Sequence, residues 1–383
     1  MTITNLRRQI TTHSEECALL LGNGINNYSE IGCSWTQLLQ NLHDEFLPEL
    51  HFKKVEGITY TEIFDTFEIS IIKKTKRFET NILNPIKLNF DISHSEEIFN
   101  KIQKIASDGC TNLINPHDPK IKEVLESFKK ANAAFKEIGG SKLVLLMSML
   151  GNNFGNSINS ILIRYICQTM ATWKFSEKHR RLTQFAQSYD IPILTTNYDN
   201  LFAKSINARF INFSKNKIDE TLPISCCYTT QSIPDVNKFA IWHLNGMLTY
   251  PKSIVIGLSH YMRNLEKIRK LIIPTNYFNA ELFENIIFTN SAIKDTWINL
   301  IFTKELYIFG LSLDTDEVLL RWLLLERAKL FSLYQDKHKG CWYVLTKKDY
   351  HKLTTGKKYF LKSIGCEIVI MEDYDAMYNA ISI

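Results

Sequence analysis

The sequence predicts an α/β fold, with a doubly wound parallel sheet and a large helical insertion. Short runs rich in β-branched or aromatic residues recur along the chain, and several are continuously apolar, which is typical of strands covered on both faces. Helical patterns follow most of these runs, and strands that alternate with helices indicate a parallel sheet. A long central stretch, in contrast, contains apolar residues mainly at helical spacing.

The predicted elements of the sheet domain follow one another in this order. The strands are Ala18–Leu21, Pro192–Thr196, Phe239–Leu244, Ser253–Gly257, Glu305–Phe309, Cys341–Leu345 and Glu367–Met371. The helices that follow several of them are Trp35–Phe46, Tyr198–Ile206, Asp316–Leu330 and Tyr374–Ala380. Lys215–Asn237 has neither pattern, so we predict an irregular excursion there.

The stretch between Leu47 and Asp190 interrupts this alternation. Its helical segments are Thr61–Thr75, Ser95–Ala106, Ile121–Ile138, Ser141–Met149 and Ser157–Ser188. Pro and Gly residues separate several of these segments. We therefore predict a sheet domain made of residues 1–46 and 190–383, with residues 47–189 as a helical insertion.

Composition and charge argue against several classes of protein. The net charge of +5 is spread along the chain, whereas a nucleic-acid binder usually gathers its excess charge in a patch, so direct nucleic-acid binding is not expected. Charges interrupt the apolar runs well short of the ~20 residues that a membrane span requires. Eight cysteines include no C-x-x-C pair, and no charged-then-apolar leader opens the chain. We expect a cytoplasmic protein with reduced thiols and no structural zinc.

The first candidate motif is the turn Gly22-Asn23-Gly24-Ile25-Asn26, directly after the first predicted strand. Two glycines allow a sharp turn and let a ligand approach the backbone amides. A lone G-x-G is more often an ordinary turn between a strand and a helix. Only further motifs at the same edge of the sheet would favour a binding site.

Polar residues stand at the carboxyl end of the second predicted strand, where open α/β sheets bind ligands. They are Thr195, Thr196, Asn197 and Asp199. Asp199 has an alternative role, because Asp also caps helices and a helix is predicted to follow.

The strand Phe239–Leu244 ends in the same way, with His243, Asn245 and Gly246. Because side chains alternate along a strand, we expect His243 and Asn245 to share one face. A single histidine in this position is more often structural than catalytic, but a third polar strand end strengthens the functional interpretation.

The fourth motif follows the strand Glu305–Phe309. Gly310 ends the strand, and the Ser312 hydroxyl could donate to a ligand oxygen. Asp314 and Glu317 are expected to cap the apolar helix that follows, a structural role that needs no ligand.

Taken in order, the motifs G-N-G-I, T-T-N-Y-D, H-L-N-G and G-L-S-L resemble those of the sirtuin family, and more closely those of sirtuin-like proteins of bacterial anti-phage defence. The resemblance covers roughly Ala18–Leu50 and Asp190–Ile383. It implies a Rossmann-like sheet whose four strand ends face one molecule of NAD+.

The resemblance also implies a role for each matched residue. Asn197 would hold the nicotinamide ribose and the attacking water, and Asp199 would contact the nicotinamide amide. His243 would be the base, although the family usually has its histidine immediately before the glycine, where this chain has Asn245. The other implied NAD+ contacts are Gly22, Asn23, Gly24, Ile25, Asn26, Thr196, Asn245, Gly310 and Ser312.

One departure from the family separates two activities. Sirtuin deacylases contain a four-cysteine zinc module between their last two motifs, and this chain has no cysteine between Cys227 and Cys341. Because that module helps to form the groove for an acylated lysine, its absence argues against deacylation. The large helical insertion is similar to that of sirtuin-like effectors that hydrolyse NAD+.

The sequence therefore predicts an NAD+ hydrolase that releases nicotinamide and ADP-ribose and acts in anti-phage defence by depleting NAD+. The resemblance implies regulation by a HerA-type hexameric ATPase partner or by self-assembly into a homo-oligomer. Two alternatives stay open: a module that senses NAD+ or ADP-ribose without turnover, and an NAD+-dependent protein deacylase.

Overall fold

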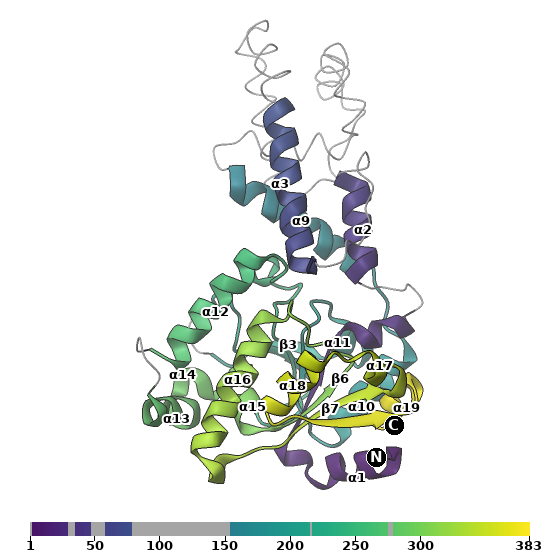
Figure 1. Ribbon diagram of the computed structural model, residues 1–383, viewed down its shortest axis with the longest axis vertical. Coiled ribbons are helices and arrows are strands. Elements are labelled where there is room, and N and C mark those ends of the chain that lie inside the picture. The colour runs from purple at the N-terminus through teal and green to yellow at the C-terminus, as the bar shows by residue number, and fades with distance from the viewer. Residues whose placement is uncertain (1, 30–34, 47–57, 79–153, 215–216, 275–278) are drawn as a thin grey trace, which may run out of the picture. The chain divides into compact units, whose positions relative to one another are not determined.

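The computed structural model describes residues 2–29, 35–46, 58–78, 154–214, 217–274 and 279–383 (Figure 1). Contacts divide the chain into two compact units, which we call the sheet unit (Met1–Ser34 with Met170–Ile383) and the helical unit (Trp35–Thr169). These units divide the chain at other positions than the domains predicted above, so the predicted domain boundaries stay a prediction.

The sheet unit is built on eight strands in the order β3-β4-β5-β2-β1-β6-β7-β8. The strands are β1 (Cys17–Leu21), β2 (Ile193–Thr195), β3 (Arg209–Asn212), β4 (Cys226–Thr229), β5 (Ile241–His243), β6 (Glu305–Phe309), β7 (Cys341–Thr346) and β8 (Glu367–Met371). The pairs β3-β4 and β4-β5 are antiparallel, and the other neighbouring pairs are parallel. The α/β fold with a mostly parallel sheet is thus confirmed.

The parallel strands β5-β2-β1-β6-β7-β8 are wound outward from β1, because the chain first adds β2 and β5 on one side and later β6, β7 and β8 on the other. This is the Rossmann order 3-2-1-4-5-6, in which ligands bind beside the carboxyl ends at the point where the winding reverses. Here that point lies between β1 and β6.

Helices cover both faces of the sheet, and β1 shows why. Ala18 and Leu20 belong to one buried cluster, whereas Cys17, Leu19 and Leu21 belong to the other. The helices that contribute to the first cluster are α12 (Leu258–Ile272), α13 (Ala280–Thr289), α14 (Ser291–Lys294), α15 (Trp297–Thr303), α16 (Val318–Leu333) and α18 (Thr355–Ser363). Those that contribute to the second are α1 (Ile3–Thr12), α10 (Glu177–Ser188), α11 (Leu201–Ser205) and α19 (Tyr374–Asn379). The short helix α17 (Lys347–Lys352) follows β7.

Six of the seven predicted strands are present, and one prediction is wrong. Ser253–Gly257 is not a strand: Val255 donates its amide to the Asn245 carbonyl (2.9 Å), so the segment folds back on the end of β5. Its three apolar residues are buried as a connection, which gives the same composition as a buried strand. Two short strands, β3 and β4, were not predicted, and β4 lies inside the predicted irregular excursion.

The described part of the helical unit contains α2 (Trp35–Phe46), α3 (Tyr60–Phe78) and most of α9 (Phe154–Ala171). Helix α3 matches the segment predicted at Thr61–Thr75. The segment predicted at Ser157–Ser188 forms two helices, α9 and α10, rather than one. The helices predicted at Ser95–Ala106, Ile121–Ile138 and Ser141–Met149 lie outside the described residues. None of the described helices combines the length and the apolar character that a bilayer span would need.

Candidate active site

The four predicted motifs lie side by side at one edge of the sheet. Strand pairing aligns His243 of β5 with Thr195 of β2, Thr195 with Leu21 of β1, and Leu21 with Phe309 of β6. Each motif therefore begins where its strand ends, at the same level as its neighbours. The residues that sequence patterns placed at separate strand ends form one continuous edge.

The glycine turn after β1 packs directly on the turn after β6. Gly22 and Gly24 donate their amides to the carbonyls of Phe309 (3.0 Å) and Gly310 (2.9 Å). A side chain on Gly22 would place its Cβ 2.4 Å from the Gly310 oxygen, so only glycine permits this approach. Because both amides already have acceptors, the role of these two glycines in the structure is close contact between the turns.

Asn26 joins the glycine turn to the motif after β2. Its Nδ2 donates to Asp199 Oδ2 (2.9 Å) and to Asn23 Oδ1 (2.7 Å). Asp199 Oδ1 also accepts from the Leu201 amide (3.1 Å), so Asp199 both contacts the start of the following helix and faces the turn. Burial raises the pKa of Asp199.

His179, in the first turn of α10, continues this chain of hydrogen bonds. Its Nε2 lies 2.9 Å from Asn26 Oδ1, and its Nδ1 lies 2.8 Å from the Ser176 hydroxyl. Because Asn26 Oδ1 can only accept, the proton of His179 is on Nε2 and Nδ1 accepts from Ser176. Burial lowers the pKa of His179 to about 4, so the ring is neutral at pH 7. No sequence pattern pointed to this residue.

Asn197 and His243 are brought together at the ends of β2 and β5. His243 Nδ1 lies 2.7 Å from the Asn197 carbonyl, which can only accept, so Nδ1 carries the proton and Nε2 has a free lone pair. Burial lowers the pKa of His243 to about 4. Two buried atoms, His243 Nε2 and Asn197 Nδ2, have no hydrogen-bond partner among the residues that the structure describes.

Asn245 does not share a face with His243, contrary to expectation. The His243 ring packs edge-on against Tyr228, in the cluster with α10 and α11, whereas Asn245 Nδ2 points to Tyr261 of α12 and to Glu317 (3.3 Å). The strand ends at His243, and Gly246 has a φ of +99°, so alternation does not extend to Asn245. The two side chains therefore belong to opposite layers.

The remaining predicted residues occupy the same edge. Thr196 is buried and donates its amide to the Leu21 carbonyl (3.2 Å). Ile25 is buried in the cluster to which α10 and α11 contribute. The Ser312 side chain is exposed, while its carbonyl accepts from Lys357 Nζ and from the Tyr343 hydroxyl. Ser312 is thus held by its backbone and leaves its hydroxyl outward.

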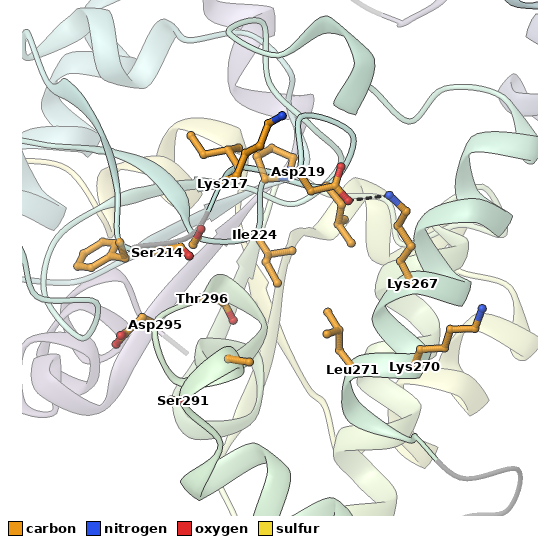
Figure 2. A pocket seen from close by; sticks show the side chains of 16 residues that line it. Ser214, Lys217, Asp219, Ile224, Lys267, Lys270, Leu271, Ser291, Asp295 and Thr296 are labelled. Carbon is orange, nitrogen blue, oxygen red and sulfur yellow. Dashed lines mark hydrogen bonds and ion pairs between the residues drawn. The ribbon is translucent and has the colours of Figure 1, made fainter.

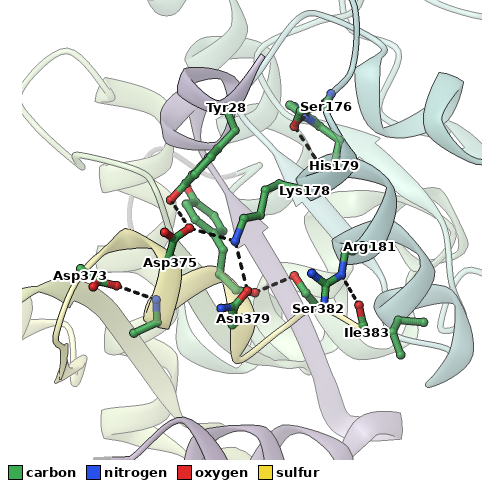
Figure 3. A network of polar contacts seen from close by, with 12 residues as sticks. Tyr28, Ser176, Lys178, His179, Arg181, Asp373, Asp375, Asn379, Ser382 and Ile383 are labelled. Atoms are coloured by element: carbon green, nitrogen blue, oxygen red, sulfur yellow. Dashed lines mark hydrogen bonds and ion pairs between the residues drawn. The ribbon is translucent and has the colours of Figure 1, made fainter. Parts of the chain in front are cut away.

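Helix α19 packs against the glycine turn through Tyr378. The Tyr378 hydroxyl lies so close to Gly24 and Gly310 that an added Cβ would meet it at 3.0 and 2.1 Å. A polar network outside this contact holds α19 to α10 and to the end of the turn (Figure 3). In it, Lys178 Nζ contacts Asp375 (2.9 Å) and Asn379 (3.1 Å), and the Tyr28 hydroxyl donates to Asp375.

A pocket of about 710 Å³ lies elsewhere in the sheet unit (Figure 2). It is lined by the segment around β3 and β4, by the end of α12 and by α14, and none of the predicted site residues contributes to it. Its Lys267 pairs with Asp219 (2.7 Å), and its Lys270 pairs with Glu266 (2.7 Å). Within the described ranges, no three His, Cys, Asp or Glu side chains are grouped to hold a metal ion.

The SIR2-like domain family matches residues 192–364. This range lies within the sheet unit and runs from β2 to α18, so it includes Asn197, His243 and Gly310 but not the glycine turn after β1. A comparison with curated proteins finds no match. The chain thus contains a SIR2-like domain on a Rossmann-like sheet, and this domain implies an activity that involves NAD+. The resemblance to sirtuins is confirmed at this level.

Proposed function

We propose that this protein is an NAD+ hydrolase that releases nicotinamide and ADP-ribose. The observation that carries the proposal is the pairing of Asn197 with His243 at the edge of a SIR2-like domain. It leaves His243 Nε2 and Asn197 Nδ2 buried without partners among the described residues. Because buried polar atoms are normally hydrogen-bonded, such a pair is suited to a polar ligand.

The reaction breaks the bond between C1′ of the ribose and the nicotinamide nitrogen, which keeps the electron pair and becomes neutral. Water forms the new bond to C1′, and its proton passes to a base and then to solvent. The ribose cation is electrophilic enough that positioning provides most of what is needed. Neutral His243, with a lone pair on Nε2, can accept this proton, and Asn197 would hold the ribose and the water.

The rest of the edge would bind the dinucleotide around this pair. Asp199, oriented by Asn26, would contact the nicotinamide amide, and NAD+ would lie beside the point where the winding of the sheet reverses. The further contacts proposed are Gly22, Asn23, Gly24, Ile25, Thr196, Asn245, Gly310 and Ser312. No zinc is needed for this chemistry.

We further propose that the hydrolase acts in the cytoplasm against phage, by depleting NAD+. Unrestrained activity would kill the host cell, so the protein requires a restraint. The sequence resemblance supports a homo-oligomer regulated by a HerA-type hexameric ATPase. Size measurement of the chain with and without that ATPase, followed by NAD+ turnover of each species, tests this part separately.

Incubation of the purified protein with NAD+, alone and with its ATPase partner, tests the central proposal by the nicotinamide released. We expect Asn197→Ala and His243→Ala each to lower release by about 10² to 10⁴ fold. His351→Ala, which changes an exposed histidine on α17, is the matched control and should retain wild-type turnover. Absence of release under both conditions would refute hydrolysis.

A sensing module is the second candidate, because the family's histidine position is occupied by Asn245 and this side chain is turned toward Glu317. Binding of NAD+ without nicotinamide release in the same assay would support it. Release that requires an acylated peptide would instead indicate a deacylase.

A further inference from the structure

Glu317 does not cap helix α16 through its side chain, although its position in the sequence predicts this role. It occupies the N-cap position of α16, yet its side chain makes no capping hydrogen bond. Asp314, its expected partner in capping, instead accepts from Lys357 Nζ (3.2 Å). The capping pair predicted from the sequence is therefore not formed, and the Glu317 carboxyl group is directed elsewhere.

The Glu317 carboxyl group reaches the candidate active site. Its Oε2 accepts from Asn245 Nδ2 at 3.3 Å, although Asn245 follows β5 and Glu317 follows β6. Strands β2 and β1 lie between those two, so the contact joins strands that are roughly 14 Å apart at ordinary strand spacing. The intervening strand ends carry Asn197 and Gly22. A carboxyl group thus lies at the edge where the proposed reaction would occur.

Among the described residues, few positive charges lie near the Glu317 carboxyl group: Lys357 is the cation that acts on its pKa, against two neighbouring carboxylates. Burial raises the pKa of Glu317 to about 7, and the neighbouring carboxylates of Asp316 and Asp314 also act to raise it, while the Asn245 hydrogen bond and Lys357 lower it. The groups that face Glu317 are Asn245 after β5, Tyr198 after β2, Tyr261 of α12, Asp314 and Asp316 of its own loop, and Lys357 of α18. Both tyrosines have a pKa well above the ordinary value, so neither ionises near pH 7.

We propose that Glu317 is a positioning residue of this site, which holds the Asn245 side chain through its ionised carboxylate and makes turnover depend on its own protonation. This inference rests on the proposed NAD+ hydrolysis. The ionised form offers Asn245 Nδ2 a charge-assisted hydrogen bond, which is about twice as strong as a neutral one. Protonation weakens that bond, so Asn245 is held less firmly at lower pH.

The test is the pH profile of kcat/KM for nicotinamide release between pH 6 and pH 8. For the wild type we expect a rise of about threefold, because an acid with a pKa of about 7 changes from mostly protonated to mostly ionised in this range, while the protonated form keeps a weaker hydrogen bond to Asn245. His243 cannot produce this step, since its pKa of about 4 keeps it neutral throughout.

Two substitutions distinguish the effect of the Glu317 charge from the effect of its hydrogen-bonding side chain. Glu317→Gln keeps an oxygen that can accept from Asn245 but cannot ionise, so its profile should change less than about twofold. Glu317→Ala removes the acceptor and should lower kcat/KM at pH 8 by about tenfold, mainly through kcat. Glu281→Gln, an exposed position on α13, is the matched control and should keep the wild-type profile. A full pH step in Glu317→Gln, or a flat profile in the wild type, would overturn the inference.

If the wild type releases no nicotinamide at any pH, the proposed hydrolysis is wrong, and this result is distinct from a failure of the Glu317 inference. Calorimetric titration of NAD+ at pH 6 and pH 8 then decides the role of Glu317. Affinity that changes with pH in the wild type and not in Glu317→Gln supports it. The same behaviour in both proteins excludes it.

Discussion

Gly310 has a backbone conformation and a close neighbour that both disfavour a side chain. Its φ of +59° is in the left-handed region, and an added Cβ would lie 2.1 Å from the Tyr378 hydroxyl. We expect Gly310→Ala to lower the free energy of unfolding by about 3 kcal/mol or more, measured by urea denaturation.

Gly365 supplies the control for this prediction. It has a similar φ of +68°, but nothing lies within 4 Å of an added Cβ, so Gly365→Ala should cost only about 1 kcal/mol. Tyr378→Phe removes the hydroxyl that causes the clash and should recover part of the loss in the double variant. Equal losses for the two glycines would show that the clash is not the cause.

Three buried histidines make the fold sensitive to acid. Burial lowers the pKa of His179, His243 and His260 to about 4, below the ordinary 6.5 of an unfolded chain. Between these values the unfolded state binds protons that the folded state does not, so stability present above pH 6.5 is lost as the pH falls toward 4.

His179→Asn tests the contribution of one of these groups. We expect its unfolding free energy to fall less steeply with pH than that of the wild type, with a difference in slope of about 1 kcal/mol per pH unit between about pH 6 and 4.5. Urea denaturation at several pH values measures this slope. Parallel curves for the two proteins would show that His179 is not buried neutral in solution.

The sequence predicted which strand ends lie side by side but not which side chains meet there. Polar residues after apolar strands are visible locally, and their alignment follows from a parallel sheet. His179 reaches Asn26 across 153 positions, and Asn245 reaches Glu317 across 72, and no local pattern encodes such contacts. His179 and Glu317 both stand at or near the starts of helices, so their sequence context suggests only capping.

Among the elements of the fold, helix α16 is hydrogen-bonded through Arg327 to the residues that precede β6 and β7. Its Nη2 lies 3.0 Å from the Lys304 carbonyl, 2.9 Å from that of Lys339 and 3.1 Å from that of Gly340. The side chain is buried, and burial lowers its pKa. We expect Arg327→Met to lower the free energy of unfolding by about 2 to 4 kcal/mol, because it removes the Arg327 donor from the carbonyls of Lys304 and Lys339, and the first of these residues is buried.

Arg180→Met is the corresponding surface substitution. Arg180 is paired with Glu177 on exposed α10 positions, and such pairs contribute about 1 kcal/mol or less. Similar losses in the two variants would contradict a special role for Arg327. Thermal or urea unfolding measures both.

The prediction of elements succeeded where strands are buried on both faces and failed where they are short or absent. β6 and β8 were predicted with their observed bounds, because short apolar runs rich in β-branched or aromatic residues are typical of strands in a parallel sheet. β4 has only four residues between polar segments, and the buried connection around Val255 has the composition of a strand without a partner. Composition reports burial, whereas pairing depends on distant parts of the chain.

For the whole molecule, the two contact units predict that the sheet unit folds alone. Both hydrophobic clusters of the described chain that cover β1 consist only of residues from this unit. We expect a protein in which a flexible Gly-Ser linker replaces residues 35–169 to unfold cooperatively in urea. The slope of its unfolding free energy against urea concentration should be smaller than that of the full chain, because less surface is exposed when the shorter protein unfolds. A gradual transition would indicate that the sheet unit depends on the helical unit.

The central position of β1 has a consequence for synthesis of the chain. β1 pairs on one side with β2 and on the other with β6, and Cys17 is separated from its neighbour Glu305 by 288 positions. At translation rates of about 5 to 20 residues per second, the apolar segment CALLL waits roughly 15 to 60 s for its second neighbour. A nascent chain therefore exposes its most central strand longest and depends on protection from aggregation during that time. Until β6 has emerged, the nascent chain also lacks the last of the four strand ends that carry the predicted motifs. A product of interrupted translation that stops before β6 therefore cannot form the complete candidate site.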